Sequence, residues 1–168
     1  MHPIVELARR AVEAFVKKGE RISPTLLPPG LAPKAAVFVS LKKHGELRGC
    51  IGTLSPTCEQ LGEEVIQNAI SSCAKDPRFP AVEEQELADL SFSVDVLEPA
   101  VPVGDLSELD PKIYGVIVSK GFRRGVLLPD LEGVDTVEKQ LSIAMRKAGI
   151  GPDESGVAVS RFRVVRYT

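Results

Sequence analysis

The sequence predicts a single-domain α+β protein in which helices pack on a mainly antiparallel sheet. Two β-rich pairs, each with a short glycine-containing turn, predict hairpins within residues 35–53 and 114–128. Three segments, residues 3–18, 61–73 and 137–148, carry apolar residues at helical spacing. Because the strands of a hairpin are antiparallel neighbours, consecutive hairpins with helices packed on them favour the α+β class.

The first helix is expected from Pro3 to Lys18, because proline suits a first turn and Gly19 suits the exit. Residues 20–34 hold four prolines among apolar residues, which predicts an ordered extended loop. The first hairpin then follows, with strands at residues 35–42 and 46–53.

The second helix is expected over residues 61–73, with capping chemistry offered by residues 55–57. A proline-containing loop at 76–80 ends it, and an acidic turn or short helix follows at 83–88. Residues 90–97 alternate between apolar and polar side chains, which predicts a half-covered strand.

The second half continues with hairpin strands at residues 114–119 and 125–128. A third helix is expected from a cap at Asp135 or Thr136 to Gly149. Residues 157–167 alternate as one final strand.

Both halves therefore share the order hairpin, helix, strand, which points to an internal duplication. Arg48-Gly49-Cys50-Ile51 resembles Arg124-Gly125-Val126-Leu127, and Gln60-Leu61 resembles Gln140-Leu141. Val126 then stands where the first half has Cys50.

Composition excludes several classes of function. The 21 basic and 23 acidic residues nearly cancel, which disfavours a dedicated nucleic-acid binder. No apolar run approaches a membrane span, and the N-terminus lacks a secretory pattern, so we expect a cytoplasmic protein. The nucleotide-binding and hydrolase signatures are absent, and we predict no cofactor.

The cysteines and histidines predict neither a metal site nor a Cys-His pair. The three cysteines lack a Cys-x-x-Cys element, and the two histidines are far apart in sequence, which disfavours zinc. Free thiols in a reducing compartment are the expectation. His44 and Cys50 are six extended residues apart, roughly 20 Å at about 3.3 Å per residue, so they do not meet within the hairpin.

The hexapeptide Leu47-Arg48-Gly49-Cys50-Ile51-Gly52 is the densest unusual feature, because two glycines weaken a strand. We expect something to approach the backbone there. Alternation puts Arg48 and Cys50 on one face, where the guanidinium would lower the pKa of the thiol and prepare a nucleophile or redox sensor. The alternative is a buried inert thiol, because a two-residue turn at His44-Gly45 pairs Cys50 with Val39.

A second candidate is the loop Asp76-Pro77-Arg78-Phe79-Pro80, which two prolines fix. Either Asp76 caps the chain, Arg78 pairs locally and Phe79 fills the core, or Arg78 joins Arg48 in a pocket for an anionic small molecule. A third candidate is a set of basic residues that form a patch if their strands adjoin and a solvated sheet face otherwise: Lys120, Arg123, Arg124, Arg161, Arg163 and Arg166.

These motifs resemble the AMMECR-domain family over nearly the whole chain. The hexapeptide is similar to the family signature, residues 76–80 to its second motif, and residues 115–118, 125–129 and 147–150 to its C-terminal block. The prokaryotic branch, the AmmeMemoRadiSam system protein A type, is the closer likeness. Ala81 and Met145 depart from the family pattern.

The resemblance implies an α+β fold with two unequal subdomains and a cleft lined by the hexapeptide. It also implies a shared pathway with Memo-like and radical-SAM proteins. Candidate catalytic residues are Cys50 and Arg48, and candidate substrate-binding residues are Gly49, Gly52, Asp76, Arg78 and Phe79. Two functions stay open: an accessory enzyme or substrate-binding component of a modification pathway, and a noncatalytic protein-protein interaction module.

Overall fold

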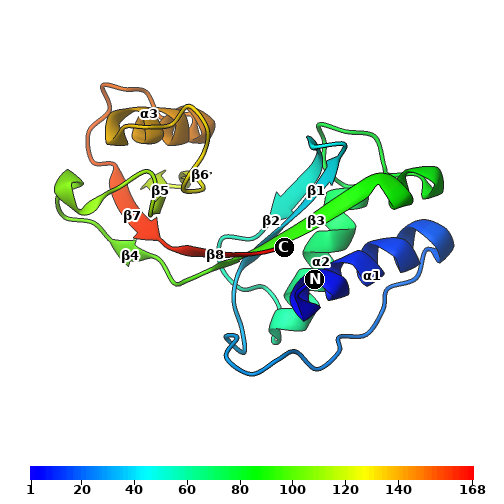
Figure 1. The fold of residues 1–168 in the computed structure, drawn as a ribbon. Coiled ribbons are helices and arrows are strands. Elements are labelled where there is room, and N and C mark those ends of the chain that lie inside the picture. Colours follow the sequence, from blue (N-terminus) through cyan, green and yellow to red (C-terminus); the bar gives the residue numbers. More distant parts are fainter. The chain divides into compact units, whose positions relative to one another are not determined.

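The computed structural model describes residues 1–168, which divide into two compact units (Figure 1). Unit 1 comprises Met1–Leu97 and Val165–Thr168, and unit 2 comprises Glu98–Val164. Both contain an antiparallel sheet and helices, so the predicted α+β class is confirmed.

Unit 1 holds a four-stranded sheet in the order β2-β1-β3-β8. Its elements are α1 (Pro3–Lys18), β1 (Val37–Lys43), β2 (Glu46–Gly52), α2 (Leu61–Ala74), the 3-10 helix η1 (Glu84–Asp89), β3 (Leu90–Leu97) and β8 (Val164–Tyr167). The predicted helices, hairpin and alternating strand of this half are confirmed, including both ends of α1.

The core of unit 1 lies on one face of its sheet. Val37, Val39 and Leu41 alternate along β1 as fully buried residues and pack with the apolar residues of α1 and α2. Ser40 lies between them in sequence and therefore points to the opposite face. Both helices thus cover one face and leave a second, more polar face.

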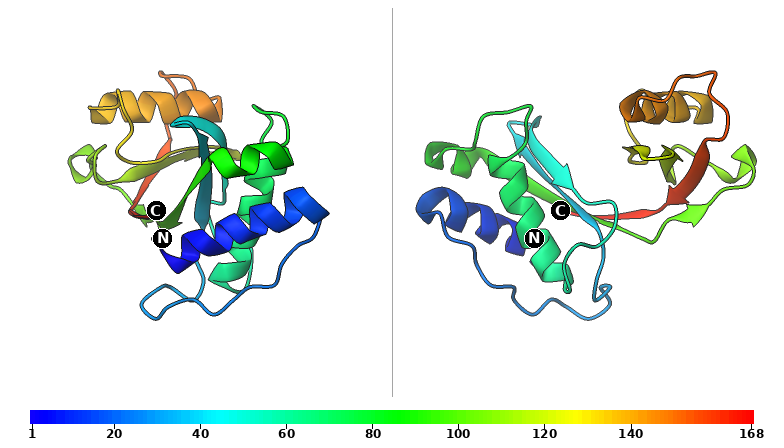
Figure 2. Two further views of the ribbon diagram at one scale, coloured as in Figure 1. Left: turned by 45° about the vertical axis from the view of Figure 1, so that its right-hand side comes forward. Right: turned by 180° about the vertical axis from the view of Figure 1, so that it is seen from behind.

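The chain termini meet in unit 1, side by side in Figures 1 and 2. The His2 side chain accepts a hydrogen bond from the Ile4 N–H and caps α1, and its ring lies 4.4 Å from that of Tyr167. The His2 N–H also donates to the Thr168 carbonyl oxygen at 3.3 Å.

Unit 2 holds a second four-stranded sheet in the order β4-β7-β5-β6. Its elements are β4 (Val101–Pro102), the 3-10 helix η2 (Leu106–Glu108), β5 (Gly115–Lys120), β6 (Arg123–Leu127), α3 (Val137–Ala148) and β7 (Ala158–Phe162). The Thr136 hydroxyl accepts a hydrogen bond from the Lys139 N–H and caps α3, and Gly149 ends the helix at a φ of 72°.

The prediction of one final strand over residues 157–167 was wrong. The segment forms two strands, β7 in the sheet of unit 2 and β8 in the sheet of unit 1, separated by Arg163. Alternation persists because both pieces are extended, so the pattern does not reveal the change of sheet.

The two units repeat one topology: β2-β1-β3 with α2 corresponds to β6-β5-β7 with α3. A methyl group at Gly49 would overlap the Ser72 carbonyl oxygen of α2, and one at Gly125 would overlap the Ala144 carbonyl oxygen of α3. Each glycine therefore lets a helix approach a hairpin.

The polar contacts of these helices correspond as well. Four residues before Ser72, Asn68 donates its side-chain amide to the Val37 carbonyl oxygen at 2.9 Å. Four residues before Ala144, Gln140 donates to the Tyr114 carbonyl oxygen at 2.8 Å. The counterpart of Gln140 is thus Asn68 and not Gln60, which lies at the cap of α2.

Candidate functional site

The hexapeptide forms most of β2, which is the edge strand of the unit 1 sheet. The predicted register was wrong by one residue. Lys42 pairs with Leu47 and Leu41 pairs with Gly49, so Arg48 is the extra residue of a β-bulge. Cys50 therefore lies opposite Ser40 and not opposite Val39. The shift places the thiol on the polar face of the sheet, away from the helices.

Both glycines of the hexapeptide meet parts of unit 1. The space above Gly49 is filled by the backbone of α2, and the carbonyl carbon of Ser72 would lie 3.2 Å from an added methyl group. The ring of Phe38, the residue opposite Gly52, covers Gly52. The close approach expected from the sequence is thus made by a helix and an aromatic ring.

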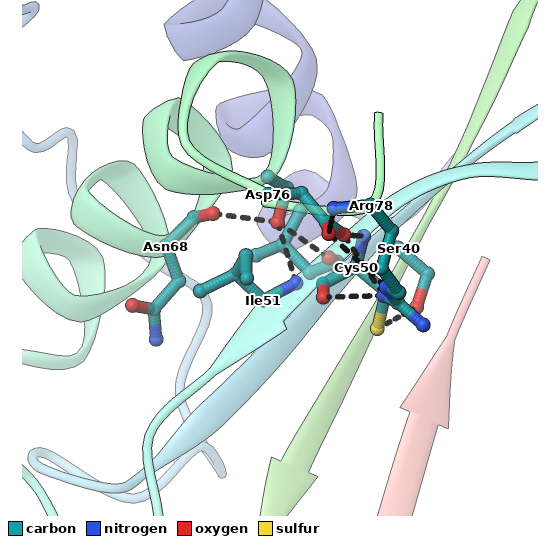
Figure 3. A network of polar contacts seen from close by, with 8 residues as sticks. Ser40, Cys50, Ile51, Asn68, Asp76 and Arg78 are labelled. Carbon is teal, nitrogen blue, oxygen red and sulfur yellow. Dashed lines mark hydrogen bonds and ion pairs between the residues drawn. The ribbon is translucent and has the colours of Figure 1, made fainter. Parts of the chain in front are cut away.

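Polar groups hold the Cys50 backbone in place at the sheet edge (Figure 3). The Cys50 N–H donates to Asp76 Oδ2 at 3.0 Å, and the Cys50 carbonyl oxygen accepts from Arg78 Nη2 at 3.2 Å. The next N–H along β2, that of Ile51, donates to the Ser72 hydroxyl at 2.9 Å. These contacts satisfy backbone groups of an edge strand that has no further strand beside it.

The side chain of Cys50 is half-buried and lies 3.1 Å from the Ser40 hydroxyl. Burial raises the pKa of the Cys50 thiol, and the Ser40 hydrogen bond and the Arg78 charge offset this only in part. The predicted lowering by Arg48 is not found. The group at this position is a neutral thiol at pH 7, which can donate or accept a weak hydrogen bond.

Asp76 and Arg78 form a pair beside Cys50. The buried Asp76 carboxylate accepts from the Arg78 backbone N–H and from its guanidinium, whose Nη2 lies 2.8 Å from Oδ2. The guanidinium holds the pKa of Asp76 well below its usual range. Phe79 is half-buried, with the Arg78 guanidinium 5.5 Å and the Arg48 guanidinium 6.0 Å from its ring centroid.

Arg48 is bound by a carboxylate that the sequence did not single out. Its Nε and Nη2 donate to the two oxygens of Glu86, at 3.0 and 3.1 Å, and Lys43 donates to the same carboxylate. The Arg48 guanidinium lowers the pKa of Glu86 to about 2. Arg48 thus ties the bulged strand to η1.

The polar face of the unit 1 sheet carries a row of small side chains. Ser40 lies between Cys50 on β2 and Ser93 on β3, and all three are half-buried. In the next row Asp95, only 1% exposed, forms a bidentate pair with Arg166 of β8, at 2.7 and 2.9 Å. The alternation of residues 90–97 put Ser93 and Asp95 on one face, but only the register brings them beside the thiol.

The histidines lie elsewhere. His44 occupies the hairpin turn at a φ of 52°, with Nε2 3.8 Å from Asp89, and His2 caps α1. The structure brings together no group of three or more His, Cys, Asp or Glu residues that could hold a metal ion. No helix has the length and apolar character needed to cross a membrane.

The predicted basic set is divided among separate contacts. Lys120 and Arg123 pair with Glu154, Arg166 pairs with Asp95, and Arg161 and Arg163 lie against Tyr114.

Comparisons with known proteins cover almost the whole chain. A family model described as AMMECR1 matches residues 5–167. A Thermotoga maritima protein is 52% identical, over 99% of this chain and 97% of its own. A Clostridium acetobutylicum protein is 48% identical over 98% of this chain, which spans only 36% of that relative. The crystal structure of an uncharacterized Pyrococcus horikoshii protein has a TM-score of 0.89 and 36% identity, over 97% of this chain and 88% of that one.

Proposed function

This chain belongs to the AMMECR1 family, and we propose that it is a substrate-binding component of a modification pathway in which Memo-like and radical-SAM proteins also act. The substrate site is the polar face of the unit 1 sheet around Cys50. The observation that carries the proposal is the row Cys50–Ser40–Ser93, which is half-buried on the face that α1 and α2 leave uncovered.

The chemistry of this row suits recognition by hydrogen bonds. Two hydroxyls and a thiol offer donors and acceptors that rotate to fit a ligand. The neighbouring charges, Arg78 and Arg166, are each paired with a buried aspartate, so they orient the row without adding net charge. A small, polar, largely neutral substrate fits these groups better than the anionic molecule expected from Arg48 and Arg78 together.

Cys50 then contacts the substrate and does not attack it. A nucleophilic cysteine needs a stabilised thiolate, whereas burial raises the pKa of this thiol. Arg48, the other candidate catalytic residue, has the Nε and Nη2 donors of its guanidinium bound to Glu86. We assign to Arg48, Gly49 and Gly52 the role of shaping the strand that presents Cys50.

The proposal is tested by NMR mapping with two small polar probes, acetamide and 2-propanol. Amide shifts are expected to cluster at Ser40, Cys50 and Ser93 and to be lost in Ser93→Leu, which fills the row. Cys50→Ser keeps a hydrogen-bonding group and is expected to keep the response. The matched control is Cys58→Ser, because Cys58 is a half-buried thiol that lies outside the row. Probe shifts scattered over the surface would overturn the assignment.

A noncatalytic interaction module is the second candidate, and the neutral thiol favours it as well. A pull-down with the Memo-like and radical-SAM proteins of the same organism separates the two functions. Partner binding that survives both Cys50→Ser and Ser93→Leu, together with absent probe clustering, would establish the module and exclude the substrate site.

A further inference from the structure

Unit 2 carries a group of side chains that the proposed substrate site does not use. Tyr114 lies directly before β5, one residue beyond the pair Gly115–Phe162, and Arg161 and Arg163 flank Phe162 on the neighbouring strand. The guanidinium carbon of Arg161 lies 4.2 Å from the centroid of the Tyr114 ring, and that of Arg163 lies 5.4 Å from it. Two cations thus share one aromatic ring.

Arg161 differs from the other half-buried arginines of the chain. Those residues, Arg9, Arg48 and Arg123, each form a salt bridge with a glutamate. Arg161 forms no salt bridge, and its Nη1 donates to the backbone carbonyl oxygen of Glu108 at 2.5 Å. A half-buried guanidinium has lost part of its hydration, so the absence of a counter-ion leaves its charge uncompensated.

The neighbouring groups add to this positive potential. Arg163 donates a hydrogen bond to the Tyr114 hydroxyl, and this bond with the charges of both arginines lowers the pKa of Tyr114. Stacking on the ring occupies the face of the Arg161 guanidinium and leaves available those edge N–H groups that do not bind the Glu108 carbonyl oxygen. The donors of two arginines therefore converge beside one phenol.

We propose that Arg161, Arg163 and Tyr114 form a binding site for a phosphate group carried by a small molecule. A phosphate offers acceptor oxygens in several directions and takes hydrogen bonds from two guanidiniums at once, whereas a single carboxylate presents two coplanar oxygens. Acidic residues border the site, since Asp110 acts on Tyr114 and Glu98 on Arg163. Their negative charges leave room for a small ligand but would repel a polynucleotide, which needs an extended basic surface.

Tyrosine fluorescence offers a direct test, because the chain has two tyrosines and no tryptophan. In Tyr167→Phe protein, Tyr114 is the only tyrosine, and inorganic phosphate is titrated at constant ionic strength. We expect a saturable change that Arg161→Gln weakens by about tenfold or more, as for the loss of a charged hydrogen-bond partner. Arg124→Gln removes an exposed arginine of the same unit and is expected to leave the titration unchanged.

Acetate titrated in the same way separates the two anion classes, and equal binding of acetate would overturn the phosphate assignment. A response that does not saturate, or that Arg161→Gln leaves intact, would overturn the site itself. If Arg161→Gln does not fold, Arg163→Gln at an exposed position gives the same test, because it removes the second guanidinium that donates to the phosphate.

Discussion

Replacing Gly49 with alanine tests the contact between β2 and α2. The added methyl group would overlap the Ser72 carbonyl oxygen, which belongs to the helix backbone and cannot rotate away. The helix must therefore move by about 1 Å. Overpacking of this kind lowers the free energy of unfolding by about 1–3 kcal/mol. We expect the upper end of this range, because the movement also disturbs the bonds from Ile51 N–H to Ser72 and from Ser72 to the Val39 carbonyl oxygen.

The assay is urea unfolding followed by circular dichroism, together with a thermal melt. A loss of about 3 kcal/mol corresponds to a fall in Tm of about 6–12 °C for a protein of this size. Gly104→Ala is the matched control, because its methyl group meets nothing within 4 Å and no stability loss is expected. Gly125→Ala, which meets the Ala144 carbonyl oxygen, is expected to cost as much as Gly49→Ala. A Gly49→Ala protein as stable as the Gly104→Ala control would refute the reasoning.

Three further predictions concern single side chains. Iodoacetamide is expected to modify native Cys50 slowly at pH 7, with a rate still rising at pH 9, because burial raises the pKa of the thiol above its ordinary value; mass spectrometry that shows a plateau below pH 8 would contradict this. Glu86→Gln is expected to destabilise the protein by about 2 kcal/mol at pH 7. The folded pKa of Glu86 is about 2 against an ordinary 4.5, so its contribution to stability is complete above pH 4.5 and is lost as the pH falls toward 2. The urea midpoints of the wild-type and Glu86→Gln proteins should therefore converge in acid. A constant gap between them would count against the pairing with Arg48. Asn68→Ala removes the bond from the side-chain amide to the Val37 carbonyl oxygen, which still accepts from the Thr53 N–H, so it should cost about 1 kcal/mol in the same urea assay, whereas an unchanged midpoint would show that the bond contributes nothing.

The secondary structure was largely predictable from local patterns. The ends of α1 follow from Pro3 and Gly19, and β3 follows from strict alternation over residues 90–97, because these signals depend on neighbouring residues alone. The repeated hairpin-helix-strand order was also readable. The division of residues 157–167 between two sheets was not, since a strand carries the same alternation whichever partner it pairs with.

The candidate site was less predictable, because it depends on one bulge. A regular hairpin would put Cys50 opposite Val39, and the extra residue at Arg48 puts it opposite Ser40 instead. Nothing in the local sequence marks the bulge, which forms where Arg48 binds Glu86 of a distant segment. Because Arg48 binds Glu86, its charge does not lower the pKa of the Cys50 thiol, and burial raises that pKa instead.

The return of β8 to the sheet of unit 1 sets the order in which the protein is completed. Residues 98–164 form an insertion between β3 and β8, so the ribosome delivers all of unit 2 before the last strand of unit 1 emerges. Unit 2 is encoded contiguously and has every strand it needs once β7 is made. Synthesis of unit 1 therefore starts before that of unit 2 and ends after it. Until β8 is synthesised, the buried Asp95 lacks its partner Arg166, and β3 is an edge strand with unpaired backbone groups.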